Sequence, residues 1–310
     1  MPNPIQGLHH VTSMAAHARR NNAFYTGTLG LRRVKKTVNF DEPSVYHLYF
    51  GNRHGTPGSV MTCFPFPHIA PGRPGTGEAS QTVFSVPEGA LAYWRERLPE
   101  HAVTVLDDGM RFDEKRLHLA GPDGEILALV EVADDARTPH SDGPVPADTG
   151  LRGFHSVTLR LRDSTETGEL LRFMGYREVA RQGGFTRYAL DMGNGANVID
   201  IETTQAPAAA RLGAGSVHHV AFAVADRAAQ DRVRDNLVSA GYQPTPVIDR
   251  DYFLSVYFRT PGGVLFEIAT NEPGFDRDEA PDQLGQALKI PAQHAHLRER
   301  IEKSLPPLDD

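Results

Sequence analysis

The chain is poor in the features that would assign it to several common classes of protein. Its 310 residues include a single cysteine, Cys63, which excludes a disulfide framework and a thiolate zinc site within one chain. No uninterrupted apolar run reaches membrane-spanning length. Residues 1–7 lack the charged start and apolar stretch of a signal peptide. We therefore expect a cytoplasmic protein that has no membrane partner.

The charge of the chain also limits its partners. The formal net charge is -7, and no basic stripe with interleaved aromatic residues is present, so we expect no nucleic-acid partner. Forty per cent of the residues are apolar and 23% are charged, which is typical of a globular protein with a substantial core. The length suits two domains of ordinary size, or one pseudo-symmetric pair.

What the sequence does contain is a unit that recurs four times, from about residues 8, 80, 153 and 217. Each unit reads as a strand, a helix and about three more strands. Paired units can curl their sheets into a cup, which one small sheet cannot do alone. The predicted fold class is α+β, with four βαβββ units forming two pseudo-symmetric cup-like sheet modules.

A linker separates the second unit from the third. Residues 134–150 are rich in Asp, Pro, Gly, Ser and Thr, which is linker composition. We therefore predict an N-terminal pair of units at 1–136, a C-terminal pair at 150–272, and a tail at 273–310. The tail carries a predicted helix at 293–305, which we interpret as packing or subunit-contact surface.

Two histidine pairs, His9-His10 and His218-His219, each open a predicted strand. Side chains alternate between the faces of a strand, so His10 shares its face with Thr12 and not with His9. Glu267 lies in the apolar run 263–268, where a carboxylate is costly to bury without a partner cation. Two imidazoles and one carboxylate can hold ferrous iron on one face and leave the other face open.

The hairpin glycines allow the last strands of the four units to be compared. The residues four positions after Gly58, Gly124, Gly195 and Gly263 are Thr62, Ala128, Ile199 and Glu267. Only the fourth unit has a carboxylate at this register, whereas Glu131 and Glu202 lie three positions further along, at odd parity. Among the first strands, either His10 or His155 could complete a set with His219 and Glu267, depending on which units pair. The other would be an ordinary core histidine.

Four stretches together resemble a known superfamily. They are LHHVT (8–12), YHLYFGNRHGTPGSVMTCFP (46–65), VHHVAF (217–222) and DRDYFLSVYFRTPGGVLFEIAT (249–270). The chain is similar to the vicinal oxygen chelate superfamily, which contains glyoxalase I, bleomycin-resistance proteins and extradiol dioxygenases. Within it, the chain resembles the dioxygenases that open hydroquinone rings, typified by 2,6-dichlorohydroquinone dioxygenase. The resemblance spans nearly the whole chain.

The resemblance implies that His10, His219 and Glu267 are the metal ligands, so that units one and four meet. Thr62 would occupy the vacant fourth position, and the other two units would form a metal-free cup around His155. The implied cofactor is Fe(II), with Mn(II) as an alternative. The resemblance also implies roles around the metal for five further residues: His9, Thr12, His218, Arg250 and Tyr257.

Several of these residues have a plainer interpretation without the resemblance. Tyr257 would be a core tyrosine, and Arg250 would be a surface arginine beside two aspartates. With the resemblance, Tyr257 could hydrogen-bond the reacting oxygen, and Arg250 could stabilise the distal oxygen anion of the substrate. His47 and Tyr49 either line the pocket or pack in the core.

The implied function is a non-haem Fe(II)-dependent, extradiol-type dioxygenase that cleaves the ring of a hydroquinone or related dihydroxybenzene with O2. Its partners would be a small aromatic diol and O2, and a homo-oligomer remains open. One alternative is a glyoxalase-like isomerase or lyase that uses zinc, nickel or manganese. Another is a metal-free binding protein of the bleomycin-resistance type. A set of three protein ligands argues against the first, and the presence of any such set argues against the second.

Overall fold

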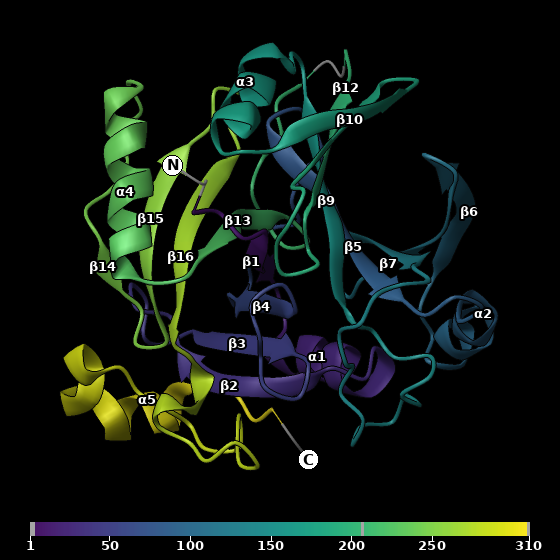
Figure 1. Cartoon of the computed structure of the whole chain (residues 1–310). Coiled ribbons are helices and arrows are strands. Elements are labelled where there is room, and N and C mark those ends of the chain that lie inside the picture. The colour runs from purple at the N-terminus through teal and green to yellow at the C-terminus, as the bar shows by residue number, and fades with distance from the viewer. Residues whose placement is uncertain (1–3, 206–207, 309–310) are drawn as a thin grey trace.

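In the computed structural model, which describes residues 4–205 and 208–308, the chain forms two curled eight-stranded sheets (Figure 1). Residues 1–3 and 309–310, at the outer ends of the predicted N-terminal pair and of the tail, lie outside the described residues. Each of the four units contributes a strand, a helix and three further strands, in that order. The prediction of an α+β fold with four βαβββ units in two cup-like modules is therefore confirmed.

Units one and four build the first sheet. Unit one comprises β1 (Leu8–Ala15), α1 (Ala18–Ala23), the π-helical turn η1 (Phe24–Thr28), β2 (Arg32–Val38), β3 (Tyr46–Gly51) and β4 (Val60–Pro65). Unit four comprises β13 (Val217–Val224), α4 (Arg227–Ser239), β14 (Ile248–Asp249), β15 (Phe253–Arg259) and β16 (Leu265–Pro273). The strand order is β14-β15-β16-β13-β1-β4-β3-β2.

Units two and three build the second sheet. Unit two comprises β5 (Glu78–Val86), α2 (Leu91–Glu100), β6 (Val105–Arg111), β7 (Glu114–Ala120) and β8 (Ile126–Glu131). Unit three comprises β9 (Gly153–Leu161), α3 (Thr165–Phe173), β10 (Arg177–Gln182), β11 (Phe185–Ala189) and β12 (Val198–Thr203). The order is β10-β11-β12-β9-β5-β8-β7-β6.

Each sheet therefore takes one unit from each half of the chain. The central pairs, β1 with β13 and β5 with β9, are antiparallel and join residues about 70 to 210 positions apart in sequence. Backbone hydrogen bonds also link the two sheets, from Leu8 N to Ala196 O (2.8 Å) and from Phe154 N to Gly58 O (2.7 Å). The predicted boundaries at 1–136, 150–272 and 273–310 divide the chain in sequence and stay a prediction.

Alternate residues of the central strands serve the two faces of each sheet. On β13, Val220, Phe222 and Val224 join the main core, and α4 packs against this strand and against β16. The intervening His219 and Ala221 face into the cup. No described helix has both the length and the apolar character needed to cross a bilayer.

The four hairpin glycines that set the register share one backbone conformation. Gly58, Gly124, Gly195 and Gly263 have φ values of 85°, 88°, 88° and 91°. This left-handed region is costly for residues with a Cβ atom and open to glycine. A glycine of the same conformation therefore precedes the last strand of every unit, and counting from it aligns units one, two and four. In unit three the turn has one more residue after the glycine, since Leu190 N bonds to Asn197 O, so the count there is one short.

The tail docks on unit one. The predicted helix at 293–305 consists of a 3-10 helix, η3 (Ala292–Leu297), followed by α5 (Arg298–Ser304). Ile301 of α5 is buried, and Tyr46 of β3 donates a hydrogen bond to Pro306 O (3.0 Å). Earlier in the tail, Glu279 accepts a hydrogen bond from the fully buried Lys35 Nζ (2.5 Å). The packing interpretation of the tail agrees with these contacts.

Glu125 lies in the turn before β8, against the first unit. Its Oε2 accepts a hydrogen bond from Asp123 N (2.9 Å), and its Oε1 accepts one from Tyr25 Oη (3.4 Å). Burial raises the pKa of Glu125 to about 7, because the hydrogen bonds only partly offset the cost of desolvating the carboxylate. In the unfolded chain this carboxyl would titrate at its ordinary pKa of about 4.3.

We expect this carboxyl to make the protein less stable as pH rises. When folding raises the pKa of a carboxyl group, protonation of that group favours the folded state. The gain in stability is complete at pH values below the pKa of the unfolded chain, and it is lost as pH rises through the pKa of the folded protein. Between pH 5 and 8 the loss is about 2.5 kcal/mol. Urea unfolding of Glu125→Gln across this range should show a correspondingly flatter pH dependence. Equal slopes in the variant and the wild type would contradict the burial argument.

Candidate metal centre

Strand pairing brings three side chains from distant parts of the chain to one point inside the first cup. In the β1–β13 pair, Thr12 lies opposite His219, and in the β13–β16 pair, Ala221 lies beside Glu267. The Nε2 atoms of His10 and His219 are 3.2 Å apart. Glu267 Oε2 lies 3.3 Å from the first of these atoms and 2.9 Å from the second. Of the two histidines that could complete the set, the structure brings in His10.

These distances fit the ligand set of a metal ion. Atoms bound about 2.1 Å from an ion, in neighbouring positions of an octahedron, lie about 3.0 Å apart. The three separations of 2.9, 3.2 and 3.3 Å are close to this value. Within residues 4–205 and 208–308, this is the one group of three or more His, Cys, Asp or Glu residues that could hold an ion. All three side chains are buried.

Glu267 carries an acceptor atom that lacks a donor. Its Oε1 accepts a hydrogen bond from Ser255 Oγ (2.5 Å), but Oε2 has no aligned donor among the described residues and lies only against the imidazole nitrogens of His219 (2.9 Å) and His10 (3.3 Å). Burial by itself would raise the pKa of Glu267, yet the imidazoles of His10 and His219 hold it well below its usual range. A buried, ionised oxygen without a donor is unfavourable unless a cation completes its environment.

The hydrogen bonds around His10 show which of its nitrogens is free to bind a metal. His9 Nε2 lies 3.1 Å from Thr270 O, which can only accept, so this nitrogen carries the proton. Burial, with the charge of His10 adding to it, lowers the pKa of His9 to about 3, so the ring is neutral and its Nδ1 is an acceptor. His10 Nδ1, 2.9 Å away, must then donate to it. When the His10 ring is neutral, as a metal ligand must be, the lone pair of its Nε2 therefore points at His219 and Glu267.

The second histidine pair repeats this arrangement. His218 Nδ1 and His219 Nδ1 are 2.7 Å apart, and burial is the main reason that the pKa of His218 is lowered to about 3. His9 and His218 each contact the neighbouring histidine through its Nδ1 and lie outside the cluster of three ligand atoms. Their role as residues that orient metal ligands stays a prediction. Outer hydrogen bonds of this kind fix the tautomer and ring orientation of a histidine ligand.

The predicted residues Thr12, Arg250 and Tyr257 lie at the same centre. Thr12 Oγ1 is 2.8 Å from His219 Nε2, and Tyr257 is paired with Glu267 across the β15–β16 ladder. The Arg250 guanidinium lies 5.6 Å from the ring centroid of Tyr257. Burial, and then Glu267, raise the pKa of Tyr257, so its hydroxyl keeps its proton.

The walls of the site come partly from residues that sequence reasoning did not single out. A small cavity at the cluster is lined by Asn39, Phe40, Asp41, Phe64 and Phe253, together with predicted site residues. His47 and Tyr49 of β3, left between pocket and core, also line it. The alternation of side chains along β3 could have indicated this position. Tyr49 pairs with Thr62 and so faces the cup, and His47, two residues earlier, lies on the same face.

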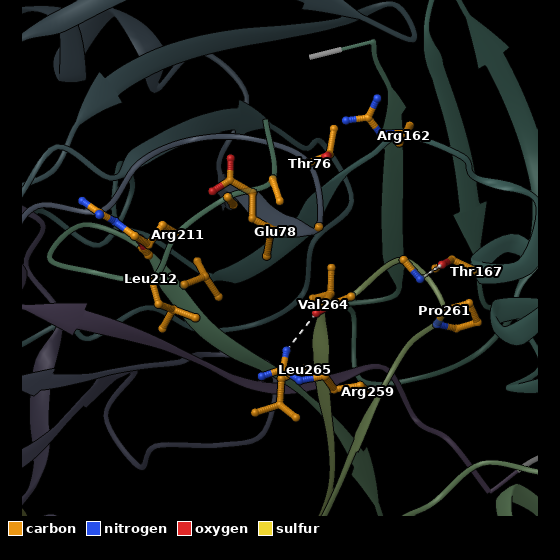
Figure 2. Close-up of a pocket in the computed structure, with 18 of the residues that line it drawn as sticks. Thr76, Glu78, Arg162, Thr167, Arg211, Leu212, Arg259, Pro261, Val264 and Leu265 are labelled. Carbon is orange, nitrogen blue, oxygen red and sulfur yellow. Dashed lines mark hydrogen bonds between the residues drawn. The ribbon is translucent and has the colours of Figure 1, made fainter. Parts of the chain in front are cut away.

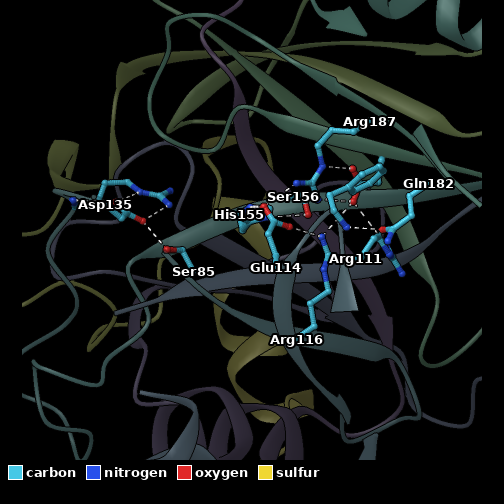
Figure 3. A network of polar contacts seen from close by, with 12 residues as sticks. Ser85, Arg111, Glu114, Arg116, Asp135, His155, Ser156, Gln182 and Arg187 are labelled. Atoms are coloured by element: carbon cyan, nitrogen blue, oxygen red, sulfur yellow. Dashed lines mark hydrogen bonds and ion pairs between the residues drawn. The ribbon is translucent and has the colours of Figure 1, made fainter. Parts of the chain in front are cut away.

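The second cup holds a buried ionic network in place of a metal set (Figure 3). His155 Nε2 contacts Glu114 Oε1 at 3.0 Å, far from His219 in the fold. Asp200 accepts two hydrogen bonds from Arg187 (2.8 and 3.0 Å) and one from Arg116 (3.3 Å). In unit three, the residue four positions after the hairpin glycine Gly195 is Ile199, and its side chain packs in the main core. Sequence reasoning missed Asp200, one position further on.

A larger cavity, about 550 Å³, lies between the two sheets (Figure 2). It is lined by mixed polar and apolar groups such as Glu78, Arg162 and Leu265, and the described residues place no converging set of metal-ligand atoms there. His218 reaches it from the far side of the β13 backbone.

Comparison with known proteins agrees with the fold and with the cluster. The model of the Glyoxalase/Bleomycin resistance protein/Dioxygenase superfamily matches residues 7–268. The chain belongs to this superfamily. It is 39% identical to MhqO of Bacillus subtilis, whose name provisionally describes a ring-cleaving dioxygenase, over 100% of this chain and 98% of that protein. It is 38% identical to the chlorohydroquinone/hydroquinone 1,2-dioxygenase of Sphingobium indicum, over 98% of this chain and 97% of that protein.

Solved structures show the same architecture. The crystal structure of a provisionally named dioxygenase from Bacillus subtilis matches with a TM-score of 0.95, at 39% identity over 99% of both chains. Glyoxalase I from Zea mays matches with a TM-score of 0.61, at 14% identity over 86% of this chain and 92% of that one, and so shares the fold alone. The predictions of superfamily and of a dioxygenase-type enzyme are confirmed by these full-length relatives.

Loss of a cluster residue should abolish binding of the metal without harming the fold. In metal-free protein, Glu267→Gln removes a buried charge and supplies an amide donor to the imidazole lone pairs. We expect it to raise the free energy of unfolding by about 1–2 kcal/mol. The same variant should gain no stability from ferrous iron, which stabilises the wild type by binding the folded state.

The measurement is thermal unfolding with and without iron under anaerobic conditions, together with metal content. His10→Ala should also lose the iron, whereas the matched variant His155→Ala, in the second cup, should keep it. Iron retained by Glu267→Gln at the wild-type stoichiometry would contradict the assignment of this carboxylate.

Proposed function

We propose that this protein is a non-haem Fe(II)-dependent, extradiol-type dioxygenase that cleaves the ring of a hydroquinone or related dihydroxybenzene. The observation that carries the proposal is the convergence of two imidazole nitrogens and one unpartnered carboxylate oxygen within 3.3 Å of one another. Such a facial set leaves coordination positions open for substrate and O2. The residues present therefore fit the metal, and Mn(II) would suit the same donor atoms.

Ferrous iron, when bound, would supply a centre at which an aromatic diol and O2 meet and exchange electrons, since O2 reacts slowly with a phenol directly. His10, His219 and Glu267 would hold the ion and leave one face open. The charge of Glu267 offsets only part of the charge of the ion, so the site keeps its attraction for a phenolate oxygen. His9 and His218 would fix the two ligand rings.

The side chains around the open face suit a flat, partly charged ring. Phe40, Phe64 and Phe253 offer apolar and aromatic surface, and they exclude water from the cluster. Arg250 offers fixed positive charge near Tyr257, and its nearest carboxylate, Asp41, is 3.8 Å away. Arg250 could therefore stabilise the anionic oxygen that is distal to the metal, while Tyr257 donates its hydroxyl proton to the reacting oxygen.

A hydroquinone is proposed as the substrate because the name of the Sphingobium indicum relative describes this chemistry. The glyoxalase alternative would use a fourth protein ligand where this chain has Thr62, whose hydroxyl is bound to Thr12 (2.9 Å) and His47 (2.9 Å). Both contacts favour a structural use of Thr62 over ligation. A metal-free binding protein of the bleomycin-resistance type would not need a buried, ionised Glu267 placed against two imidazole nitrogens.

Anaerobic reconstitution with ferrous iron, followed by measurement of oxygen uptake, tests the proposal. We expect about one O2 consumed per hydroquinone, with a ring-opened product, and no isomerisation of a glutathione hemithioacetal in parallel. Catechol, assayed beside them, shows whether the two hydroxyls must lie para to one another. Isomerisation of the hemithioacetal without oxygen uptake would overturn the dioxygenase proposal in favour of the glyoxalase alternative.

Tyr257→Phe should separate chemistry from binding. Removal of the buried hydroxyl donor is expected to lower kcat about 100-fold, since a positioned proton donor typically contributes at least this much. Anaerobic affinity for hydroquinone should change far less, because the ring is retained. The matched variant Tyr242→Phe alters a tyrosine that packs on Phe258 and should behave as wild type. Equal kcat values for Tyr257→Phe and wild type would remove the hydroxyl from the mechanism.

A further inference from the structure

A chain of four short hydrogen bonds runs from β3 to the metal cluster through Tyr49, His47 and Thr62, which take no part in the proposed reaction. Tyr49 Oη lies 2.9 Å from His47 Nδ1, and His47 Nε2 lies 2.9 Å from Thr62 Oγ1. Thr62 Oγ1 lies 2.9 Å from Thr12 Oγ1, which is 2.8 Å from His219 Nε2. Every group in the chain is buried, so water cannot readily replace any of these contacts.

The direction of the chain follows from its two ends. Burial raises the pKa of Tyr49 well above its usual range, so its hydroxyl keeps a proton, and His47 Nδ1 is the hydrogen-bond partner of this hydroxyl. A buried hydroxyl proton without an acceptor is costly, so Tyr49 donates and His47 Nδ1 accepts. At the other end, Thr12 Oγ1 lies 2.8 Å from His219 Nε2, which accepts from Thr12 when the His219 ring is neutral and carries its proton on Nδ1.

His47 connects the two ends in one tautomer. Burial, and then the nearby His10 and His219, lower the pKa of His47 well below its usual range, so the ring is neutral. With Nδ1 accepting from Tyr49, its one proton is on Nε2 and is donated to Thr62. Thr62 must then donate its own proton to Thr12. The Thr12 hydroxyl therefore accepts from Thr62 and can donate only toward the metal cluster. All four hydrogen bonds therefore run the same way, toward the metal cluster.

We propose that His47, with Tyr49 and Thr62, is a positioning residue that fixes Thr12 as a hydrogen-bond donor to the substrate oxygen. A metal would occupy the lone pair of His219 Nε2 and free the Thr12 hydroxyl for an oxygen on the open face. Because the chain makes Thr12 a donor and blocks it as an acceptor, the site selects the deprotonated hydroxyl of the diol. This inference rests on the proposed function and adds how the site recognises the phenolate form.

The tautomer itself can be observed without metal or turnover. In metal-free wild-type protein, long-range proton–nitrogen NMR of the imidazoles should show His47 protonated at Nε2 and bare at Nδ1. Tyr49→Phe removes the donor that selects this tautomer and should give a mixture of both forms. The matched variant Tyr46→Phe, on the same strand but bonded to Pro306 O, should leave His47 unchanged. A wild-type ring protonated at Nδ1 would overturn the proposal.

The consequence for recognition can be measured with 4-nitrophenol, whose bound phenolate has its own absorption band. Iron-loaded, anaerobic wild-type protein should bind the phenolate, and Thr62→Val should weaken its binding roughly tenfold, the scale of one hydrogen bond to a charged group. His47→Leu should do the same. His47→Gln, which keeps a donor toward Thr62, should restore most of the affinity. Thr158→Val, an equally buried threonine of the second cup, is the matched control.

The outcomes separate this inference from the proposed function. Wild-type affinity in both Thr62→Val and His47→Leu, with melting temperatures unchanged, overturns the positioning role even if oxygen uptake with hydroquinone is intact. Phenolate binding that depends on His47, without any oxygen uptake, overturns the dioxygenase function and leaves the positioning role standing. Wild-type protein that neither binds 4-nitrophenol as phenolate nor consumes oxygen overturns both.

Discussion

The antiparallel pairing of β1 with β13 is the contact on which the proposed site depends. It places the first strand of the chain beside a strand more than two hundred residues later and sets Thr12 opposite His219. With that register, two imidazole nitrogens meet at 3.2 Å, and the parallel neighbour β16 adds a carboxylate oxygen. A slip of one residue would turn His9 or His218 inward and the ligand set would be lost. The register of the backbone pairing therefore decides which side chains meet at the proposed site.

The two cups show how one architecture supports opposite solutions to the burial of charge. In the first, Oε2 of the buried Glu267 has no aligned donor among the described residues, and the cluster that it forms with His10 and His219 could hold a cation. In the second, the carboxylate of Asp200 accepts hydrogen bonds from Arg187 and Arg116, so its negative charge is balanced by side chains of the protein. Among the described residues of the second cup, Asp200 and Glu114 are thus paired with arginine and histidine side chains and do not form a cluster that could hold a metal ion.

Much of the fold could be predicted from the sequence because each unit repeats one pattern of turns and alternation. Counting from glycines with left-handed φ aligned Thr62 with Glu267, as the sheet pairing shows. Parity also separated His10 from His9. Sequence could not choose between His10 and His155, since long-range pairing leaves no local signal and only the resemblance decided it. Nor could it find Asp200, because the turn before β12 has one more residue after its glycine: Leu190 N bonds to Asn197 O, two positions after Gly195, where Thr260 N bonds to Val264 O, one position after Gly263. Asp200 therefore pairs with Arg187 as Glu267 pairs with Tyr257.

The central claim is that one redox-active ion is held where the first and fourth units meet. Its most direct test is anomalous diffraction at the iron absorption edge, from crystals of the anaerobically reconstituted protein. The account predicts one strong peak at about 2.1–2.2 Å from His10 Nε2, His219 Nε2 and Glu267 Oε2. A peak beside His155 in the second cup, or none at the three predicted ligands in fully loaded protein, would contradict it.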